Sequence, residues 1–349
     1  MKRYLILEDG TVFDGKAFGA DVPAVGELVF TTGMCGYIET LTDESYFGQI
    51  VLQTFPLIGN YGIIEEDFEG DCSVKAYAVQ EACDNPSNFR MQKTLDAFLK
   101  EKGIPGICGI DTRSVTKRIR EKGVMNAAVA DEIPDKLNFI KDYKIVKAVE
   151  SVTVKEPRVY NENGKYSVAL IDYGAKRNII RELVKRDCRV TLVPASASAE
   201  EILSLKPGGI MLSNGPGDPA ENVYEINEIK KLTGTVPIFG ICLGHQLLAL
   251  SLGARTEKLK YGHRGVNQPV KETDGKRTYI TSQNHGYTVV SDSIKSGKIS
   301  FINANDGTCE GIDYPEINAF SVQFHPEACS GPRDTAFLFD RFIGLMEEK

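Results

Sequence analysis

Residues 236–253, VPIFGICLGHQLLALSLG, decide how the second half of this chain folds. An apolar run of strand type, VPIFGI, leads directly into Cys242, and a helical stretch, LLALSLG, follows. Gly240 and Gly244 flank the cysteine in a G-x-C-x-G arrangement, the cysteine counterpart of the serine nucleophile elbow. Such a tight turn strains the backbone of its central residue, and the glycines carry no side chains that would clash. The stretch therefore predicts a strand, a sharp turn at Cys242 and a helix.

Cys242 at this turn is predicted to be a nucleophile. The following helix would direct its N-terminal amides and the positive end of its dipole at the sulfur, which favours the thiolate. The same amides can stabilise an oxyanion once the sulfur attacks a carbonyl. The alternative is a structural cysteine, because free cysteines are often small buried hydrophobes. The position between a strong strand and a strong helix favours the chemical interpretation.

Strand-like and helix-like segments alternate around this turn, which predicts parallel βαβ units. The fold class expected for this half is α/β, with a doubly wound and mostly parallel sheet. The expected strands are SVALID (167–172), CRVTLV (188–193), GGIMLS (208–213), RTYITS (277–282) and AFSVQF (319–324), with helices over KRNIIRELVKR (176–186) and Asp334 to Met346.

His325 is the preferred catalytic base among the four histidines. It follows the run AFSVQF and precedes Pro326 and Glu327. Residues two apart in an extended segment project to the same face, so Glu327 can orient the ring as the third member of a triad. A surface histidine beside a solvated glutamate is the alternative for this tripeptide taken alone. Of the other histidines, His245 is interpreted as a packing residue. His263 is interpreted as a turn residue without an acidic neighbour, and His285 as part of a loop that recognises the substrate.

A third feature is the loop Asn214 to Pro219, which follows GGIMLS. Its two glycines around a proline expose backbone amides that suit an oxyanion or a small polar ligand, although an ordinary connecting turn is an equal alternative. This loop, Cys242 and His325 each follow a predicted strand. Because such ends share one edge of a parallel sheet, where ligands bind, we expect the three features to converge.

The composition describes a globular protein of two domains: 349 residues, 42% hydrophobic and 26% charged, with a formal net charge of -7. The acidic balance argues against a nucleic-acid surface. No apolar run approaches the ~20 residues that span a bilayer, and the N-terminus becomes acidic before a signal-peptide core could form. We therefore expect a cytoplasmic protein with mostly reduced cysteines. No cysteine pair has zinc-site spacing, so no metal is predicted.

Three regions of the chain differ in residue composition and in predicted secondary structure. Residues 1–150 indicate a mixed α/β domain, with hairpin-type turns at Asp9-Gly10 and Asp14-Gly15 and a helix that Asp111 can cap. Residues 151–165 contain proline, asparagine and glycine among charges and are predicted to be a linker. Residues 166–349 form the α/β domain described above.

Three motifs in this order resemble the class I, triad-type glutamine amidotransferases: SNGPGDP (213–219), GICLGHQ (240–246) and VQFHPEA (322–328). The whole chain is similar to the family of small, glutamine-hydrolysing subunits of carbamoyl phosphate synthetases. This second resemblance rests on GYIETLTDESYFGQIV (36–51), FPLIGNYG (55–62), PSNFR (86–90), GICGIDTRSVTKRIR (106–120), YGHRGVNQPV (261–270) and TSQNHGYTV (281–289).

The resemblance implies that Cys242 is the nucleophile, His325 the general base and acid, and Glu327 its orienting partner. It also implies an L-glutamine site made by Ser45, Gly215, Gly217, Leu243, Gln246, Asn284, Gly286 and Tyr287. Of these, Ser45 would by itself be interpreted as a turn or helix cap.

The resemblance further implies a partner for the chain. Ammonia would pass to a large, ATP-using synthetase subunit that makes carbamoyl phosphate for arginine and pyrimidine biosynthesis. ATP, magnesium and bicarbonate would belong to that partner in a heterodimer, because this chain has no G-x-x-x-x-G-K-[ST] phosphate loop. No cofactor is then expected in this chain. The N-terminal domain, without a catalytic constellation of its own, would dock the partner.

Three alternatives stay open at this point. A glutaminase subunit of another synthetase, such as one for anthranilate or GMP, needs only the second half and not a further domain of ~150 residues. A cysteine peptidase or general thiol hydrolase would use the same nucleophile. A regulatory or docking module would carry the site as a vestige, and the intact Cys, His and Glu argue against it.

Overall fold

The computed structural model describes residues 1–275, 277–328 and 330–347. The chain divides into two compact units, Met1–Val146 and Lys147–Lys349. Within the described residues, no helix combines the length and the apolar character that a membrane crossing requires.

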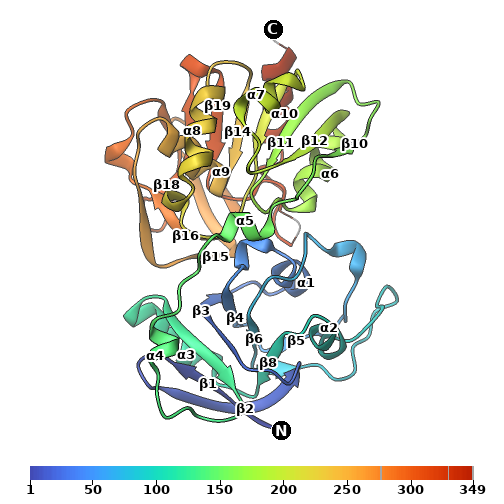
Figure 1. Ribbon diagram of the computed structural model, residues 1–349, viewed down its shortest axis with the longest axis vertical. Helices are drawn as coiled ribbons and strands as arrows, with labels where there is room; N and C mark the ends of the chain where they lie inside the picture. Colours follow the sequence, from blue (N-terminus) through green and yellow to red (C-terminus); the bar gives the residue numbers. More distant parts are fainter. Residues whose placement is uncertain (276, 329, 348–349) are drawn as a thin grey trace. The chain divides into compact units, whose positions relative to one another are not determined.

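The first unit is built around a closed β-barrel (Figure 1). The barrel strands follow each other in the order β1 (Lys2–Leu7), β2 (Val12–Gly19), β8 (Pro105–Cys108), β6 (Ala76–Ala78), β4 (Gln49–Gln53), β3 (Ala24–Thr31) and β9 (Met125–Ala130). A small separate sheet pairs β5 (Leu57–Ile58) with β7 (Glu81–Ala82), and the helices are α1 (Tyr37–Leu41), α2 (Leu95–Glu101), α3 (Thr112–Lys122) and α4 (Asn138–Lys141).

Two local predictions for this unit are confirmed, and the turn expected at Asp14-Gly15 is wrong, because both residues lie inside β2 and pair with β1. Strands β1 and β2 form an antiparallel hairpin whose turn contains Asp9 and Gly10, and Gly10 has φ 88°. The carboxylate of Asp111 accepts a hydrogen bond from the backbone N–H of Ser114 at 3.0 Å and caps α3. The mixed α/β character is also confirmed, whereas closure of the strands into a barrel was not predicted. Closure depends on pairings between strands far apart in sequence, which local patterns do not specify.

The second unit contains one ten-stranded sheet. Its strand order is β10 (Arg158–Tyr160), β12 (Cys188–Pro194), β11 (Tyr166–Asp172), β13 (Gly209–Leu212), β14 (Ile238–Ile241), β19 (Ala319–Val322), β18 (Cys309–Tyr314), β17 (Lys298–Asn303), β15 (Thr256–Glu272) and β16 (Thr278–Val289). The helices are α5 (Ala148–Val152), α6 (Arg177–Lys185), α7 (Ala199–Ser204), α8 (Val223–Leu232), α9 (Leu243–Ser251) and α10 (Phe337–Glu347).

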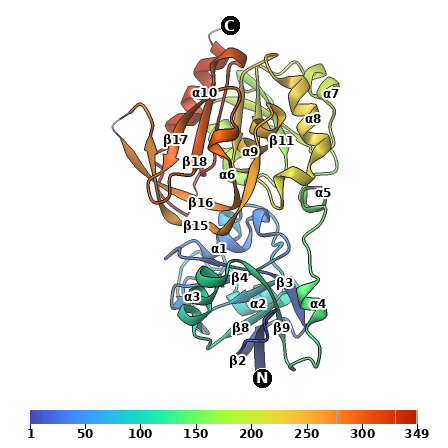
Figure 2. The same ribbon diagram turned by 90° about the vertical axis from the view of Figure 1, so that its left-hand side faces the viewer.

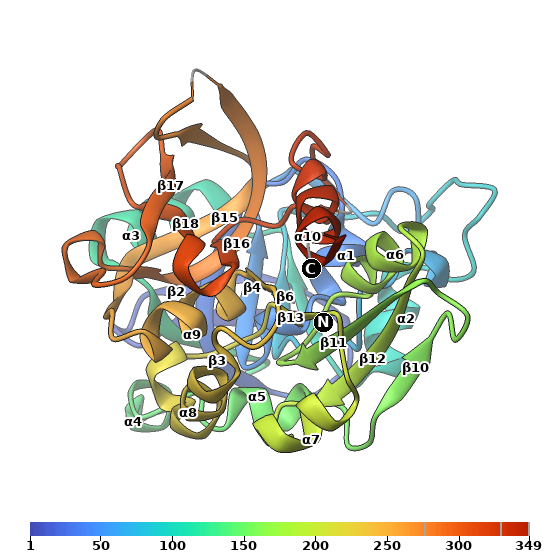
Figure 3. The ribbon, with the colours of Figure 1, turned by 90° about the horizontal axis from the view of Figure 1, so that it is seen from above.

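Helices cover both faces of this sheet (Figure 3). On one face, α7, α8 and α9 pack their apolar residues against β11, β13 and β14 in a cluster that includes Ile202, Leu232 and Leu247. On the other face, α6 and α10 pack Leu183 and Phe342 against the same strands. The doubly wound arrangement predicted from the alternation is therefore present in this part of the sheet.

The expectation of a mostly parallel sheet is correct for one half and wrong for the other. Strands β12, β11, β13, β14 and β19 are parallel neighbours. From β19 onward, β18, β17, β15 and β16 pair antiparallel, and β17 and β18 lie beside the long strands β15 and β16 (Figure 2). The connections between these later strands in the chain are shorter than the dozen or more residues that a parallel crossover needs, so the chain returns antiparallel.

The segment 151–165, expected to be a linker, contributes to the second unit instead. Its first two residues end α5, and Arg158–Tyr160 forms β10, which pairs antiparallel with β12. The backbone N–H of Val154 also donates to Asp172 Oδ2 at 2.7 Å. Polar turn residues predicted a loop here, but the open edge of β12 supplies the partner that makes a short strand possible.

Candidate active site

Cys242 lies at the turn between β14 and α9, as predicted, and its backbone is strained. Its φ of 53° and ψ of -103° fall outside the regions that a residue with a side chain ordinarily adopts. The turn is held by two hydrogen bonds, from Cys242 N to Val322 O at 2.8 Å and from Gly244 N to Ser213 O at 3.0 Å. Both neighbouring elements of the sheet therefore fix the position of the sulfur.

The two glycines around Cys242 are required by close packing. A Cβ on Gly240 would lie 2.8 Å from the carbonyl oxygen of Gly244, and a Cβ on Gly244 would lie 2.7 Å from Cβ of Leu212. Both distances are shorter than side chains tolerate. The glycines of the G-x-C-x-G pattern are therefore needed because α9 lies very close to β13 and β14.

His325 and Glu327 follow β19 and form a buried pair. Nδ1 of His325 lies 2.6 Å from Oε1 of Glu327, and the two residues are 1% and 2% exposed. The backbone N–H of His325 donates to the carbonyl of Ser282 at 3.0 Å, and the side-chain amide of Asn178 donates to the carbonyl of Glu327. These bonds hold the backbone of both residues, and the contact of Nδ1 with Glu327 orients the ring.

The charges of this pair are set by its neighbours. Burial and the Lys176 ammonium lower the pKa of His325, but Glu327 and Cys242 raise it more, so that it stands at about 9. Burial raises the pKa of Glu327, whereas His325 and Lys176 lower it further, and the net shift is downward. At neutral pH the pair is therefore an imidazolium and a carboxylate, beside Cys242.

The loop after β13 lies at the same edge of the sheet. Ser213 and Asn214 are fully buried, and the Asn214 side chain donates to the carbonyl of Gly174 at 2.9 Å and accepts from Lys176 N at 3.0 Å. Gly215 sits so close to α9 that an added Cβ would lie 2.8 Å from Cδ2 of Leu243. The three features expected to converge are thus neighbours, because β13, β14 and β19 are parallel and adjacent.

Residues expected to contact glutamine lie around Cys242 on α9 and β16. Nε2 of Gln246 donates to the carbonyl of Tyr287 at 2.8 Å, and the Cys242 thiol donates to the carbonyl of Asn284 at 3.8 Å. Gly286 follows on the same strand. Ser45 belongs to the other unit, in a short 3₁₀ turn (Glu44–Tyr46) whose N-cap, Asp43, accepts from Ser45 N at 3.0 Å. Its local structure is therefore the turn that its own residues indicate.

The other histidines differ in how well their interpretations hold. His245 is fully buried and lies 2.8 Å from Ser321 Oγ, and burial lowers its pKa to about 3, in keeping with a packing role. The expectation that His263 lacks an acidic neighbour is wrong, because the fold brings Asp306 and Glu310 to within 2.8 and 3.5 Å of its ring nitrogens. Those residues lie more than forty positions away, beyond the reach of local patterns.

Lys176 and Asn178 were not singled out from the sequence, although both contact Glu327. Lys176 Nζ lies 3.9 Å from Glu327 Oε1. The only signal was their place after the strand SVALID, at the edge of the sheet where the other site residues gather.

Comparisons with known proteins describe both units. The family model for "Carbamoyl-phosphate synthase small chain, CPSase domain" matches residues 5–129, and that for "Glutamine amidotransferase class-I" matches residues 169–345. Curated relatives called "Carbamoyl phosphate synthase small chain" are similar over nearly the whole chain. The protein of Oceanobacillus iheyensis is 51% identical and that of Staphylococcus epidermidis 49%, each covering 99% of this chain and 96% of that protein. The Listeria monocytogenes protein is 50% identical, covering 100% of this chain and 98% of its own length.

Proposed function

Because this chain belongs to the carbamoyl phosphate synthase small chain family and carries a class-I glutamine amidotransferase domain, we propose that Cys242, His325 and Glu327 form the triad that hydrolyses L-glutamine. The chain is the glutamine-hydrolysing subunit of a glutamine-dependent carbamoyl phosphate synthase, and its family implies a large-subunit partner. The observation that carries the triad is the buried His325–Glu327 pair, 2.6 Å apart, beside Cys242 at its strained turn.

In the first half-reaction, the sulfur of Cys242 attacks the side-chain amide carbon of glutamine. The developing oxyanion is held by the backbone amides of Leu243, at the N-terminus of α9, and of the loop Gly215–Gly217. Protonated His325 donates its proton to the amide nitrogen as the carbon–nitrogen bond breaks. Ammonia leaves, and a glutamyl thioester remains on Cys242.

In the second half-reaction, His325 is neutral and accepts a proton from water. The water oxygen attacks the thioester carbon, the carbon–sulfur bond breaks, and glutamate leaves. Glu327 stabilises the imidazolium that forms again and fixes the ring through Nδ1, so that Nε2 serves the reacting atoms. Ser45, Gly215, Gly217, Leu243, Gln246, Asn284, Gly286 and Tyr287 are proposed to bind the substrate.

Ammonia is proposed to pass directly to the large subunit of a heterodimer in the cytoplasm, because free ammonia is protonated near neutral pH and is then no nucleophile. The partner would use ATP, magnesium and bicarbonate to make carbamoyl phosphate for arginine and pyrimidine biosynthesis. Glutamine hydrolysis by the triad needs no cofactor in this chain. The Met1–Val146 unit is proposed to dock the partner, since its family model is specific to small chains.

The test is a Cys242→Ser variant purified with its large subunit. Glutamine-dependent synthesis should fall by a factor of roughly 10³ or more, as for other nucleophile removals, while ammonia-dependent synthesis stays normal. Cys83→Ser, at a half-buried thiol of the other unit, is the matched control and should keep both activities. Normal use of glutamine by the Cys242 variant would refute the nucleophile, and cleavage of peptides in place of glutamine would favour a peptidase.

A further inference from the structure

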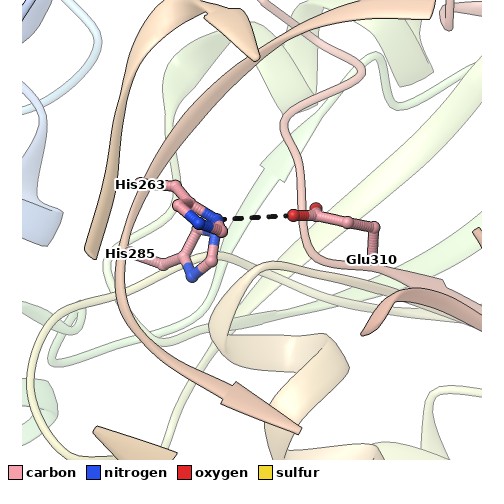
Figure 4. A group of neighbouring side chains, drawn as sticks. All are labelled: His263, His285 and Glu310. Carbon is pink, nitrogen blue, oxygen red and sulfur yellow. Dashed lines mark ion pairs between the residues drawn. The ribbon is translucent and has the colours of Figure 1, made fainter. Parts of the chain in front are cut away.

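A second group of polar side chains lies where β15, β16 and β18 meet. His263, His285 and Glu310 each offer one nitrogen or oxygen atom within 4.8 Å of the other two, and their side chains point toward one another (Figure 4). His263 and His285 are paired across β15 and β16, with ring centroids 4.9 Å apart. The mechanism described above uses none of these three side chains in chemistry.

The hydrogen bonds of His285 leave an unfavourable contact between its Nε2 and Oε1 of Gln283. Its Nδ1 lies 2.7 Å from the carbonyl of Tyr287 and must carry the proton for that bond. Its Nε2 lies 3.1 Å from Oε1 of Gln283. In a neutral ring, a nitrogen lone pair therefore faces an oxygen lone pair.

The side chain of Gln283 cannot turn over to remove this conflict. Its Nε2 donates to Oε2 of Glu310 at 3.0 Å and to Oγ1 of Thr281 at 3.2 Å. The Thr281 hydroxyl donates its hydrogen bond to the carbonyl of Gln268 at 2.9 Å, so toward Gln283 it can only accept. Exchanging the amide nitrogen and oxygen of Gln283 would break both bonds. Oε1 of Gln283 is therefore fixed opposite His285.

His263 presents a similar lone pair. Its Nε2 lies 2.8 Å from the carboxylate of Asp306 and donates to it. Its buried Nδ1 has no hydrogen-bond partner among the described residues and faces Oε1 of Glu310 at 3.5 Å. A proton on Nδ1 would satisfy this nitrogen but would leave the conflict at His285 unchanged.

We propose that Nδ1 of His263, Nε2 of His285 and the carboxylate of Glu310 bind a divalent cation of the zinc type. Two histidines and one carboxylate are an established zinc donor set, and the fourth position takes water. Bonds of about 2.0–2.2 Å need ligand atoms about 3.4 Å apart, so side chains now within 4.8 Å must close by roughly an ångström. A cation there would accept the lone pairs of His263 Nδ1 and His285 Nε2, which now face oxygen atoms.

The surroundings match those of histidines that bind metals. Such rings usually donate their other N–H to a carboxylate or a carbonyl, and Asp306 and Tyr287 serve here. The second oxygen of Glu310 is held by Gln283. Two carboxylates lie against the His263 ring, those of Asp306 and Glu310, and Glu310 is fully buried.

The site would act on the active centre through β16. His285 directly follows Asn284, whose carbonyl contacts the Cys242 thiol, and Ser282 on the same strand accepts from the backbone of His325. A cation would fix this strand in place without touching substrate. We therefore expect zinc to raise the melting temperature and to lower the KM for glutamine more than it changes kcat.

The experiment is calorimetric titration of the purified full chain with zinc chloride, with zinc content measured after dialysis. One zinc per chain is expected in the native protein and in Cys242→Ser, which excludes binding at the nucleophile. Glu310→Gln and His263→Asn should bind at least tenfold more weakly, and Asp306→Asn about 10–100-fold more weakly. Glu316→Gln, at an exposed carboxylate of the same unit, is the matched control and should bind normally.

Four results would overturn the site: no stoichiometric zinc in the native chain, unchanged affinity in Glu310→Gln, unchanged affinity in His263→Asn, or loss of binding in Cys242→Ser. Circular dichroism of each variant establishes folding. The zinc-dependent rise in melting temperature provides a second readout, and it should be smaller in both ligand variants than in the native chain while it keeps its native size in Glu316→Gln.

Discussion

Among single residues, the charge on His325 matters most for the proposed mechanism. Glu327 and Cys242 raise its pKa to about 9 against the opposing effects of burial and Lys176. The folded pKa then exceeds the ordinary value near 6.5, so the ion pair stabilises the fold fully below about pH 6.5. This stabilisation is lost as the pH rises through about 9.

Glu327→Gln is expected to lower the pKa of His325, because it removes a negative charge and keeps the shape of the side chain. The alkaline limb of glutaminase kcat/KM should move to lower pH, and the maximum should fall by roughly tenfold or more as the ring loses orientation. The fall in stability above pH 6.5 should become smaller. An alkaline limb at the native position would show that another group sets it.

The proposed catalytic residues could be predicted because each follows a strand in the parallel part of one sheet. Cys242 and His325 follow adjacent strands, so local patterns and the rule that ligands bind at this edge of a sheet were enough to bring them together. The contacts of Glu327 with Lys176, and of His263 with Glu310, were beyond that reasoning. They join residues about 150 and 50 positions apart whose meeting depends on strand order.

At the scale of elements, the close packing of α9 against β13 and β14 determines the geometry of the turn at Cys242. Gly244→Ala would drive a Cβ to 2.7 Å from Cβ of Leu212. We expect a loss of about 1–3 kcal/mol in the free energy of unfolding, together with a marked loss of glutaminase activity as Cys242 shifts. Urea denaturation and glutamine turnover measure the two effects.

Gly344→Ala is the matched control for that substitution. Gly344 lies in α10, and an added Cβ there meets nothing within 4 Å. Replacing a helical glycine in open space should stabilise the fold by about 0.5–1 kcal/mol and leave turnover unchanged. If both alanines cost the same stability, the close approach at α9 would not be the reason for the glycine.

Elements were easier to predict than their pairings. The alternation of strand and helix predicted the parallel part of the sheet, because each βαβ unit is a local feature. The antiparallel strands β15 to β18 and the barrel of the first unit depend on which distant strands become neighbours. For example, β10 could not be predicted from its polar segment, because the strand forms only by pairing with β12.

At the scale of the whole molecule, the chain combines two units with separate cores. The first packs residues such as Val51, Tyr77 and Leu99 around its barrel, and the second buries clusters on both faces of its sheet. The amidotransferase model matches only the second unit, whereas the small-chain model matches only the first. What distinguishes this family from other amidotransferases therefore lies in Met1–Val146.

Hydrogen exchange should locate the docking surface for the large subunit. Backbone amides at an interface lose contact with solvent and open less often, so they exchange more slowly. On addition of the large subunit we expect the strongest protection within Met1–Val146, measured by mass spectrometry on the intact chain. A non-reacting glutamine analogue is the control, and its protection should centre on the segments around Cys242 and His325. Protection by the large subunit confined to Lys147–Lys349 would mean that the amidotransferase unit carries the interface and that the first unit has another task.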